Sequence, residues 1–411
     1  MQDLTRPEAS RALQETGSES EQGERPGVHT RLGLSAGALA AIATIAAVGM
    51  AVSLLPPLLS FTLSARGISE RTIGILVGTI ALSALCVTPF VSRIAHRFGT
   101  ASVIAALTPL MAAMVPLAYY IQNLVLLFPI AFIYGGAICL CFTLSEFWIN
   151  AATPPGRRGL AMGIYASVLA IGMAIGPGII AITGIDSITP FLVGSGLMLL
   201  ATIPALLARR VSPEFEEAPH HGFTSFIFAV PIATLAAFVF AMAESSSFTF
   251  LPLWGRHIGL SGSVAPLLSS AMTLGSVALQ IPLGLCADRV DRRLVLLGLG
   301  VVGIAGMFGA WFLSDHTALL MAVLFIWGGS TAGLYTVGLA YLSSHFAGPS
   351  LASANAAFVF CYALGMLTGP FLVGDSMQRF PGIGFPLVLG IAFGLYSLLV
   401  LWRLVFRRKF A

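Results

Sequence analysis

The sequence predicts an all-α polytopic membrane protein with twelve transmembrane helices in two six-helix halves. Its composition, the spacing of its apolar runs and an internal repeat predict this fold. Of the 411 residues, 57% are hydrophobic and 9% are charged, whereas soluble domains carry about 25% charged residues. With a mean hydropathy of +0.92, most of the chain is suited to contact lipid or other apolar groups rather than water.

Apolar runs divide the chain into predicted helices, each close to the roughly 20 residues that a helix needs to cross a bilayer. The predicted spans are 34–63, 73–95, 101–122, 124–151, 159–184, 188–208, 224–253, 263–287, 294–313, 317–344, 353–375 and 383–405. Residues 1–33 are polar and mix both signs of charge, which predicts a disordered cytoplasmic tail. We expect no cleaved signal peptide, because no apolar segment precedes residue 32.

Basic residues predict the orientation. An even number of spans places both termini on one side of the membrane, and 17 of the 21 basic residues then fall on that side. The positive-inside rule makes this side the cytoplasm. The outer loops keep only Arg66, Arg71, Arg256 and Arg379. Because Lys409 is the single lysine, a bias that we associate with GC-rich bacterial genomes, we expect a multi-pass protein of the bacterial inner (cytoplasmic) membrane.

The two halves are predicted to be copies of one unit. FIYGGA at 132–137 recurs as FIWGGS at 325–330, and GMAIGP at 172–177 recurs as GMLTGP at 365–370, both at an offset of 193. We expect an N-terminal half at 34–208, a cytoplasmic linker at 209–223, a C-terminal half at 224–405 and a cytoplasmic tail at 406–411. Parallel repeats with a binding site at their interface are typical of secondary transporters.

One loop signature points to a known family. GLCADRVDRR at 284–293 resembles the G-x-x-x-D-R-x-G-R-R signature of the major facilitator superfamily, with Asp291 in place of the second glycine. Gly284 is expected to allow close helix approach, and Asp288 to lie against a neighbouring helix N-terminus. We expect the arginines of the loop to hold it at the cytoplasmic surface; they are Arg289, Arg292 and Arg293. The resemblance implies a latch that stabilises the outward-facing state, and a tight loop with ordinary positive-inside arginines is the alternative.

The corresponding loop of the first half, SRIAHRFGT at 92–100, keeps Arg97 and Gly99 of this signature. Ser92 replaces its first glycine and His96 replaces its acid. A histidine here would make the latch sensitive to pH. A solvated loop histidine is the alternative.

Span 5 carries Gly163, Gly172, Gly176 and Pro177, which match the G-x8-G-x3-G-P spacing of the family's antiporter motif. Ile180 replaces a later glycine of that motif. The second half repeats the pattern at Gly365, Gly369 and Pro370. Glycines at such intervals also allow close helix packing, so antiport and a purely structural role both remain open.

Span 4 narrows the resemblance within the superfamily. Many proton-coupled drug exporters carry an arginine just before the glycines of this span, where Ala131 stands here. The acid of span 4 and the following Arg158-Gly159 pair resemble the YcaD-like branch.

Two acids are candidates for substrate or proton binding. Of 17 acidic residues, fifteen fall in the tail, in loops or at span ends, and only Glu146 in span 4 and Glu244 in span 7 lie inside the spans. A charge at a helix centre costs about 2.5 to 3.5 kcal/mol on insertion scales, so such an acid should face a cavity or a partner. The facilitator fold implies that helices 1, 4, 7 and 10 line the central pathway, and both acids lie on these helices. The predicted span ends place Glu244 about 8 Å to the outer side of its helix middle, and Glu146 about 13 Å to the cytoplasmic side.

Aromatic and hydroxyl side chains share helix faces with these acids, a combination that suits an amphipathic or cationic solute. Removal from water raises the pKa of a carboxyl group, which favours exchange of a proton for substrate. A packing role near the headgroups is the alternative for Glu146. The other substrate or proton candidates are Phe142, Asn150, Ser247, Phe248, Gln280 and Tyr335.

We therefore expect a monomeric secondary transporter that exports a small organic molecule in exchange for protons by alternating access. A uniporter or a proton-coupled importer is the first alternative, and a membrane receptor on the same scaffold is less favoured. An enzyme is not expected, because no histidine, metal cluster or nucleophile and base pair occurs inside the spans. The dispersed basic residues predict no nucleic-acid partner. We expect neither a metal nor a cofactor.

Overall fold

The computed structural model describes residues 36–153, 158–185, 187–209, 224–346 and 348–406, and the described chain is helical throughout. Within these residues, twelve helices are long and apolar enough to cross a membrane. The predicted N-terminal tail, the predicted C-terminal tail apart from Phe406, and the predicted linker apart from Arg209 lie outside the described part. The fold class predicted from the sequence is confirmed.

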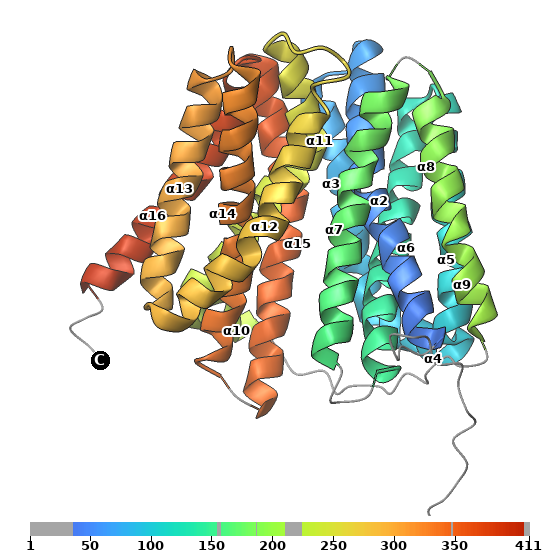
Figure 1. Cartoon of the computed structure of the whole chain (residues 1–411), viewed down its shortest axis with the longest axis horizontal. Helices are drawn as coiled ribbons and strands as arrows, with labels where there is room; N and C mark the ends of the chain where they lie inside the picture. The colour runs from blue at the N-terminus through green and yellow to red at the C-terminus, as the bar shows by residue number, and fades with distance from the viewer. Residues whose placement is uncertain (1–35, 154–157, 186, 210–223, 347, 407–411) are drawn as a thin grey trace, which may run out of the picture.

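The N-terminal half consists of α2 (Ala36–Ala65), α3 (Glu70–Val87) with η1 (Thr88–Phe90) and α4 (Val91–Phe98), α5 (Thr100–Tyr120), α6 (Leu124–Ala151), α7 (Arg158–Thr183), and α8 (Thr189–Leu200) with α9 (Thr202–Leu207). The C-terminal half consists of α10 (Thr224–Ala229), α11 (Pro231–His257), α12 (Leu267–Arg289), α13 (Arg292–Phe312), α14 (Thr317–Ser343), α15 (Gly348–Arg379) and α16 (Gly384–Phe406). Figure 1 shows the two bundles side by side, the first in blue to green and the second in yellow to red. We call the face where α2 begins and α16 ends the terminal face.

Three predicted spans are interrupted, each near a proline. Span 2 passes through η1 at Pro89, span 6 divides at Ala201 three residues before Pro204, and span 7 divides at Val230 just before Pro231. Proline lacks a backbone N–H and disfavours helical geometry in the preceding residue, so helices end or kink there. The predicted continuous span 7 was therefore wrong. Its main helix, α11, begins at residue 231 rather than 224.

Equivalent glycine contacts in the two halves confirm the repeat. In the N-terminal half, α7 packs on α2, and a Cβ added at Gly172 would lie 2.5 Å from the carbonyl oxygen of Ala46. In the C-terminal half, α15 packs on α11, and a Cβ at Gly365 would collide with the carbonyl oxygen of Phe238. The glycines lie at the same offset of 193 as the repeated motifs. Each half therefore uses glycine to bring its first and fifth helices together.

Contacts between the halves gather at the face opposite the terminal face. There Ser60 Oγ donates to the Thr249 carbonyl oxygen at 2.6 Å, and His257 Nε2 lies 3.5 Å from Glu70 Oε1. Arg71 Nε lies 3.7 Å from Asp375 Oδ1 across the same boundary. The ribbons of the two halves meet near this face and diverge toward the terminal face (Figure 1). The described contacts thus hold the molecule together at the opposite face.

Candidate substrate and proton site

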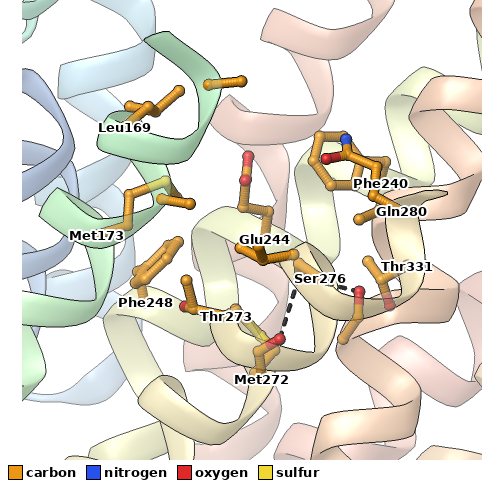
Figure 2. Close-up of a pocket in the computed structure, with 15 residues that line it drawn as sticks. Leu169, Met173, Phe240, Glu244, Phe248, Met272, Thr273, Ser276, Gln280 and Thr331 are labelled. Atoms are coloured by element: carbon orange, nitrogen blue, oxygen red, sulfur yellow. Dashed lines mark hydrogen bonds between the residues drawn. The ribbon is translucent and has the colours of Figure 1, made fainter. Parts of the chain in front are cut away.

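A pocket of about 170 Å³ lies between the halves. Helix α7 of the first half supplies one wall, and α11, α12 and α14 of the second half supply the others (Figure 2). Its lining residues all fall near the middle of their helices: Ala166, Leu169, Ala170, Met173, Phe240, Glu244, Phe248, Met272, Thr273, Ser276, Val277, Gln280, Gly328, Thr331 and Ala332. The pocket therefore lies at mid-depth, where the sites of parallel-repeat transporters are found.

Glu244 is the single charged residue among those that line the pocket. Thirteen residues of α11 lie on each side of it, so it occupies the middle of this 27-residue helix. The predicted depth of about 8 Å toward the outer side was wrong, because α11 begins later and ends later than the predicted span.

Tyr362 on α15 positions this carboxylate. Its hydroxyl donates to Glu244 Oε2 at 3.0 Å. The other oxygen, Oε1, has no hydrogen-bond partner within the described ranges, and Figure 2 shows the carboxylate extending into the pocket. One oxygen is thus anchored and the other is available to a ligand.

Aromatic rings pack against one another beside Glu244 and form what we call the aromatic cluster: Phe240, Tyr335, Phe358 and Tyr362. The ring centroids of Tyr335 lie 5.3 Å from Phe240, 5.2 Å from Phe358 and 5.8 Å from Tyr362. These are distances at which edge-to-face and tilted ring pairs attract each other. The cluster joins α11, α14 and α15, so the Glu244 side of the pocket belongs to the C-terminal half.

Glu146 does not line this pocket and is half-buried. Tyr335 interacts electrostatically with both Glu146 and Glu244. Counted from the middles of their helices, Tyr335 lies about 8 Å and Glu146 about 13 Å toward the terminal face. Within the described part of the chain, the Glu146 carboxylate makes no hydrogen bond or ion pair. Glu244, Tyr335 and Glu146 therefore lie, in that order, at increasing distance from mid-depth toward the terminal face.

The other predicted binding residues divide into two groups. Phe248 and Gln280 line the pocket, and Gln280 Nε2 also donates to Thr336 Oγ1 at 3.3 Å. Ser247 and Asn150 bond instead to their own helices, through the carbonyl oxygens of Ala243 at 2.6 Å and Glu146 at 2.9 Å. Phe142 lies outside the pocket and is 38% exposed.

Sequence reasoning missed Tyr362 and the α7 wall, and it found only Gln280 of the α12 wall. Tyr362 lies on the eleventh span, outside the set of helices expected to line the pathway. An aromatic residue in a helix carries no signal of what it will contact. The copy of Tyr362 in the first half is Leu169, which lines the pocket. The difference between tyrosine in one repeat and leucine in the other was the one sequence feature that could have marked Tyr362 as a candidate.

The predicted latch loop between α12 and α13 differs from expectation in two ways. No atom lies within 4 Å of a Cβ added at Gly284, so this glycine does not serve close packing here. Asp291 caps α13 by accepting from the Arg293 N–H at 2.9 Å, while Asp288 is 71% exposed and lies 4.0 Å from Arg292. Asp291, which departs from the signature, is thus the acid at the helix N-terminus.

The arginines of this loop fasten it to its own half. Arg292 Nη1 donates to the Ala340 carbonyl oxygen at 2.9 Å, and the Arg293 guanidinium lies 5.7 Å from the Tyr341 ring centroid. Arg289 is exposed. Cation–π and carbonyl contacts of this kind hold α13 against α14.

The corresponding loop of the first half is more open. Gly99 has φ of 79°, a left-handed conformation that favours glycine, and it joins α4 to α5. The Arg97 guanidinium lies 5.5 Å from the Phe98 ring centroid. His96 is exposed, as the alternative of a solvated histidine predicts.

The antiporter-like glycines pack as helix contacts at Gly172, Gly176, Gly365 and Gly369, where added Cβ atoms would meet α2 or α11. Pro177 and Pro370 follow inside α7 and α15. Gly163 is different, since nothing lies within 4 Å of a Cβ added there. The expected packing role of Gly163 is therefore wrong in this conformation.

A family comparison settles which fold this is. The family model described as Major Facilitator Superfamily matches residues 38–229 and 233–410. The chain belongs to this superfamily. The loop signature and the repeat had indicated it, and the superfamily is one of membrane transporters, which makes this a facilitator-type transporter.

Curated relatives within the superfamily are similar over most of their length. The uncharacterized MFS-type transporter YfkF of Bacillus subtilis is 22% identical over 345 residues, which cover 81% of this chain and 86% of that protein. The uncharacterized MFS-type transporter YcaD of Escherichia fergusonii is 24% identical over 275 residues, covering 66% and 70%. The expected resemblance to YcaD is confirmed.

Solved facilitator structures share the fold. The nucleoside transporter NupG matches with a TM-score of 0.71 at 14% identity, over 92% of this chain and all of that one. A D-xylose-proton symporter matches with a TM-score of 0.68 at 14% identity, over 89% and 96%. At such low identity these likenesses establish the architecture of the facilitator halves.

Proposed function

We propose that this facilitator-type protein exports a small organic solute across the bacterial inner membrane in exchange for protons. The observation that carries the proposal is Glu244, a carboxylate at mid-depth in a pocket between the two halves. A group that accepts a proton at the place where a solute binds can link the two movements, because each occupant displaces the other.

The arrangement of the halves supports alternating access. The ion pair of Arg71 with Asp375 and the contact of Glu70 with His257 join α3 to α15 and α11 and close the face opposite the terminal face. The positive-inside rule makes the terminal face cytoplasmic. This conformation is then the inward-facing one, in which a cytoplasmic solute reaches the pocket and the outer face is shut.

The state of the loop between α12 and α13 agrees with this assignment. Its arginines contact residues of the same half, and Asp288 is exposed. A latch that stabilises the outward-facing state would be released in an inward-facing one. We therefore propose that this loop engages the N-terminal half only when the terminal face closes.

Everted vesicles test the proposal. A panel of metabolites and drugs screened by thermal shift on the purified protein identifies a solute, and its accumulation is then measured with and without an imposed pH gradient. We expect accumulation inside vesicles that are acid inside. Glu244→Gln abolishes it because glutamine cannot carry the proton, and Glu146→Gln reduces it, while both variants keep normal abundance in the membrane.

A matched substitution at an exposed acid, Asp315→Asn, should leave accumulation unchanged. Solute flux that ignores the gradient would replace exchange by uniport. Accumulation driven by the opposite gradient would make the protein a proton-coupled importer, the second candidate. Normal coupled flux in both glutamine variants would remove the two acids from the mechanism.

A further inference from the structure

The charge of the pocket restricts what it can hold. Its lining contains one carboxylate and no arginine, lysine or histidine. In the described part of the chain, Glu244 forms no salt bridge and has one hydrogen-bond donor, Tyr362. An anionic solute would meet uncompensated repulsion here, because charges interact strongly where water is scarce.

The two side chains next to Glu244 on the same face of α11 are phenylalanines. Phe240 and Phe248 lie one helical turn before and one turn after it, and both line the pocket. Figure 2 shows Glu244 between them along the helix. Ring faces attract cations most strongly where water is excluded. A positive charge paired with Glu244 Oε1 would therefore lie beside two aromatic rings.

The rest of the lining suits an apolar body rather than a polar one. Met173 on α7 and Met272 on α12 present flexible thioethers that adapt to irregular shapes. Ser276 Oγ already donates to backbone carbonyl oxygens at 3.1 Å, those of Met272 and Gly328. Thr331 Oγ1 bonds to the Trp327 carbonyl oxygen at 2.8 Å. Both hydroxyls use their single proton within the protein and can only accept from a ligand, so few hydrogen-bond donors remain for a polyhydroxylated solute such as a sugar.

The size of the pocket limits the ligand further. Drug-sized molecules occupy pockets of about 300 to 1,000 Å³, whereas this one measures about 170 Å³. The pocket therefore accommodates a compact molecule with few heavy atoms in this conformation.

We propose that the pocket binds a small organic monocation, an alkylated ammonium whose charge pairs with Glu244 and whose apolar groups lie between Phe240, Phe248 and the α7 wall. This assignment rests on the proposed exchange function and names its substrate class. The cation and the proton then compete for one carboxylate. The other titratable groups facing Glu244 are Tyr362 on α15 and Tyr335 on α14, while the lining residues of α7 and α12 carry no charge.

Calorimetry on the purified full-length protein tests the assignment without any gradient. The probes are choline, tetraethylammonium and benzyltrimethylammonium, and 3,3-dimethylbutan-1-ol serves as the neutral isostere of choline. We expect at least one of the cations to bind and the neutral isostere not to bind. Binding should weaken as the pH is lowered, because protons occupy the carboxylate.

Matched variants locate the site. Glu244→Gln should weaken cation binding by roughly a hundredfold, the usual effect of removing one member of a desolvated charge pair. Phe248→Leu should weaken it by about tenfold through loss of a ring face. The controls are Asp315→Asn, an exposed acid, and Phe308→Leu, a 61% exposed ring on α13, and both should bind as the unmodified protein does.

The outcomes separate this assignment from the proposed function. Absence of binding by all the cations, equal binding of the neutral isostere, or undiminished binding in Glu244→Gln overturns the monocation assignment, whatever the vesicle assay shows. Cation binding at Glu244 together with flux that ignores the pH gradient supports the assignment and overturns proton exchange. Circular dichroism of each variant confirms that the helices are intact.

Discussion

Tyr362 and Glu244 form the contact on which the site depends. Two helices of the C-terminal half, α11 and α15, supply the pair, so the proposed movement of one half against the other should leave its geometry unchanged. The tyrosine hydroxyl holds one carboxylate oxygen at 3.0 Å, and the aromatic cluster fixes the position of the tyrosine ring. A carboxylate oriented in advance loses less conformational entropy when a ligand binds.

Replacing Tyr362 by phenylalanine should keep the packing of the ring and remove the hydrogen bond. Hydrogen bonds to charged groups contribute about 1.5 to 3 kcal/mol, so the Michaelis constant for solute should rise by about tenfold or more. The maximal rate should change little. Tyr120→Phe, at a 66% exposed ring, is the matched control for transport in vesicles. An unchanged Michaelis constant in Tyr362→Phe would show that the hydroxyl does not orient Glu244.

The acids could be found from the sequence because a charge inside an apolar span is costly and rare. Their partners could not. Tyr362 looks like any other aromatic in a helix, and its contact with Glu244 depends on how α15 packs on α11. Ser247, predicted from its helix face, bonds to its own backbone instead. Serine and threonine in helices commonly do this, and periodicity does not reveal it.

At the scale of elements, glycines set which helices touch. Within each half they join the first helix to the fifth, and between the halves Gly74 of α3 abuts the Pro370 carbonyl oxygen of α15. In the proposed alternating-access cycle, contacts within a half should persist, whereas the contact between the halves should break when the opposite face opens. Glycine thus serves both kinds of helix contact: Gly172 joins α7 to α2 within one half, and Gly74 joins α3 to α15 between the halves.

Gly172→Ala should destabilise the protein in every conformation, because its Cβ would press on the α2 backbone. Overpacking typically costs about 1 to 3 kcal/mol. Gly163→Ala is the matched control on the same helix: nothing lies near its Cβ, and alanine in place of glycine favours a helix by about 0.5 to 1 kcal/mol. Thermal unfolding in detergent should show a lower midpoint for the first variant and an equal or higher one for the second. A fall in the unfolding midpoint of Gly163→Ala as large as that of Gly172→Ala would contradict the close packing of α7 on α2 at Gly172.

Most element boundaries could be predicted from the sequence because the bilayer demands long apolar runs. Span 4 was predicted at the residues of α6 itself, 124–151. The errors fall at prolines, where the apolar composition continues but the helix does not. Pro231 divides the predicted span 7, and the later start and later end of α11 together move the centre to Glu244. Hydropathy reports that a segment is apolar, and only backbone chemistry reports where its helix starts.

At the scale of the whole molecule, the Arg71–Asp375 ion pair and the Glu70–His257 contact join the halves at the opposite face in this conformation. Each is a partly exposed pair of the kind that contributes about 1 kcal/mol or less. Such weak contacts suit a closure that must open during each transport cycle. The two conformations should therefore exchange in solution, and solute should change their populations.

Spin labels on paired cysteines test this exchange, in a protein whose five native cysteines are replaced. One pair, at Thr189 and Ser263, spans the halves at the opposite face. The other, at Ala151 and Ser343, spans them at the terminal face, and all four positions are exposed. When solute binds, the first distance should lengthen in the fraction of molecules in which the second shortens. Changes at one face that occur without changes at the other would contradict a rocking motion.

The pocket is built unequally from the two copies. At the offset of 193, Glu244, Tyr335 and Tyr362 correspond to Ala51, Phe142 and Leu169 in the first half. In the proposed cycle, a solute paired with Glu244 should keep its contacts with the C-terminal half throughout. Only its contact with α7 of the N-terminal half should change. Mutations in one gene segment could then alter what is carried, while the other segment keeps the motion. This division would let duplicated halves diversify their cargo without rebuilding the machinery that moves it.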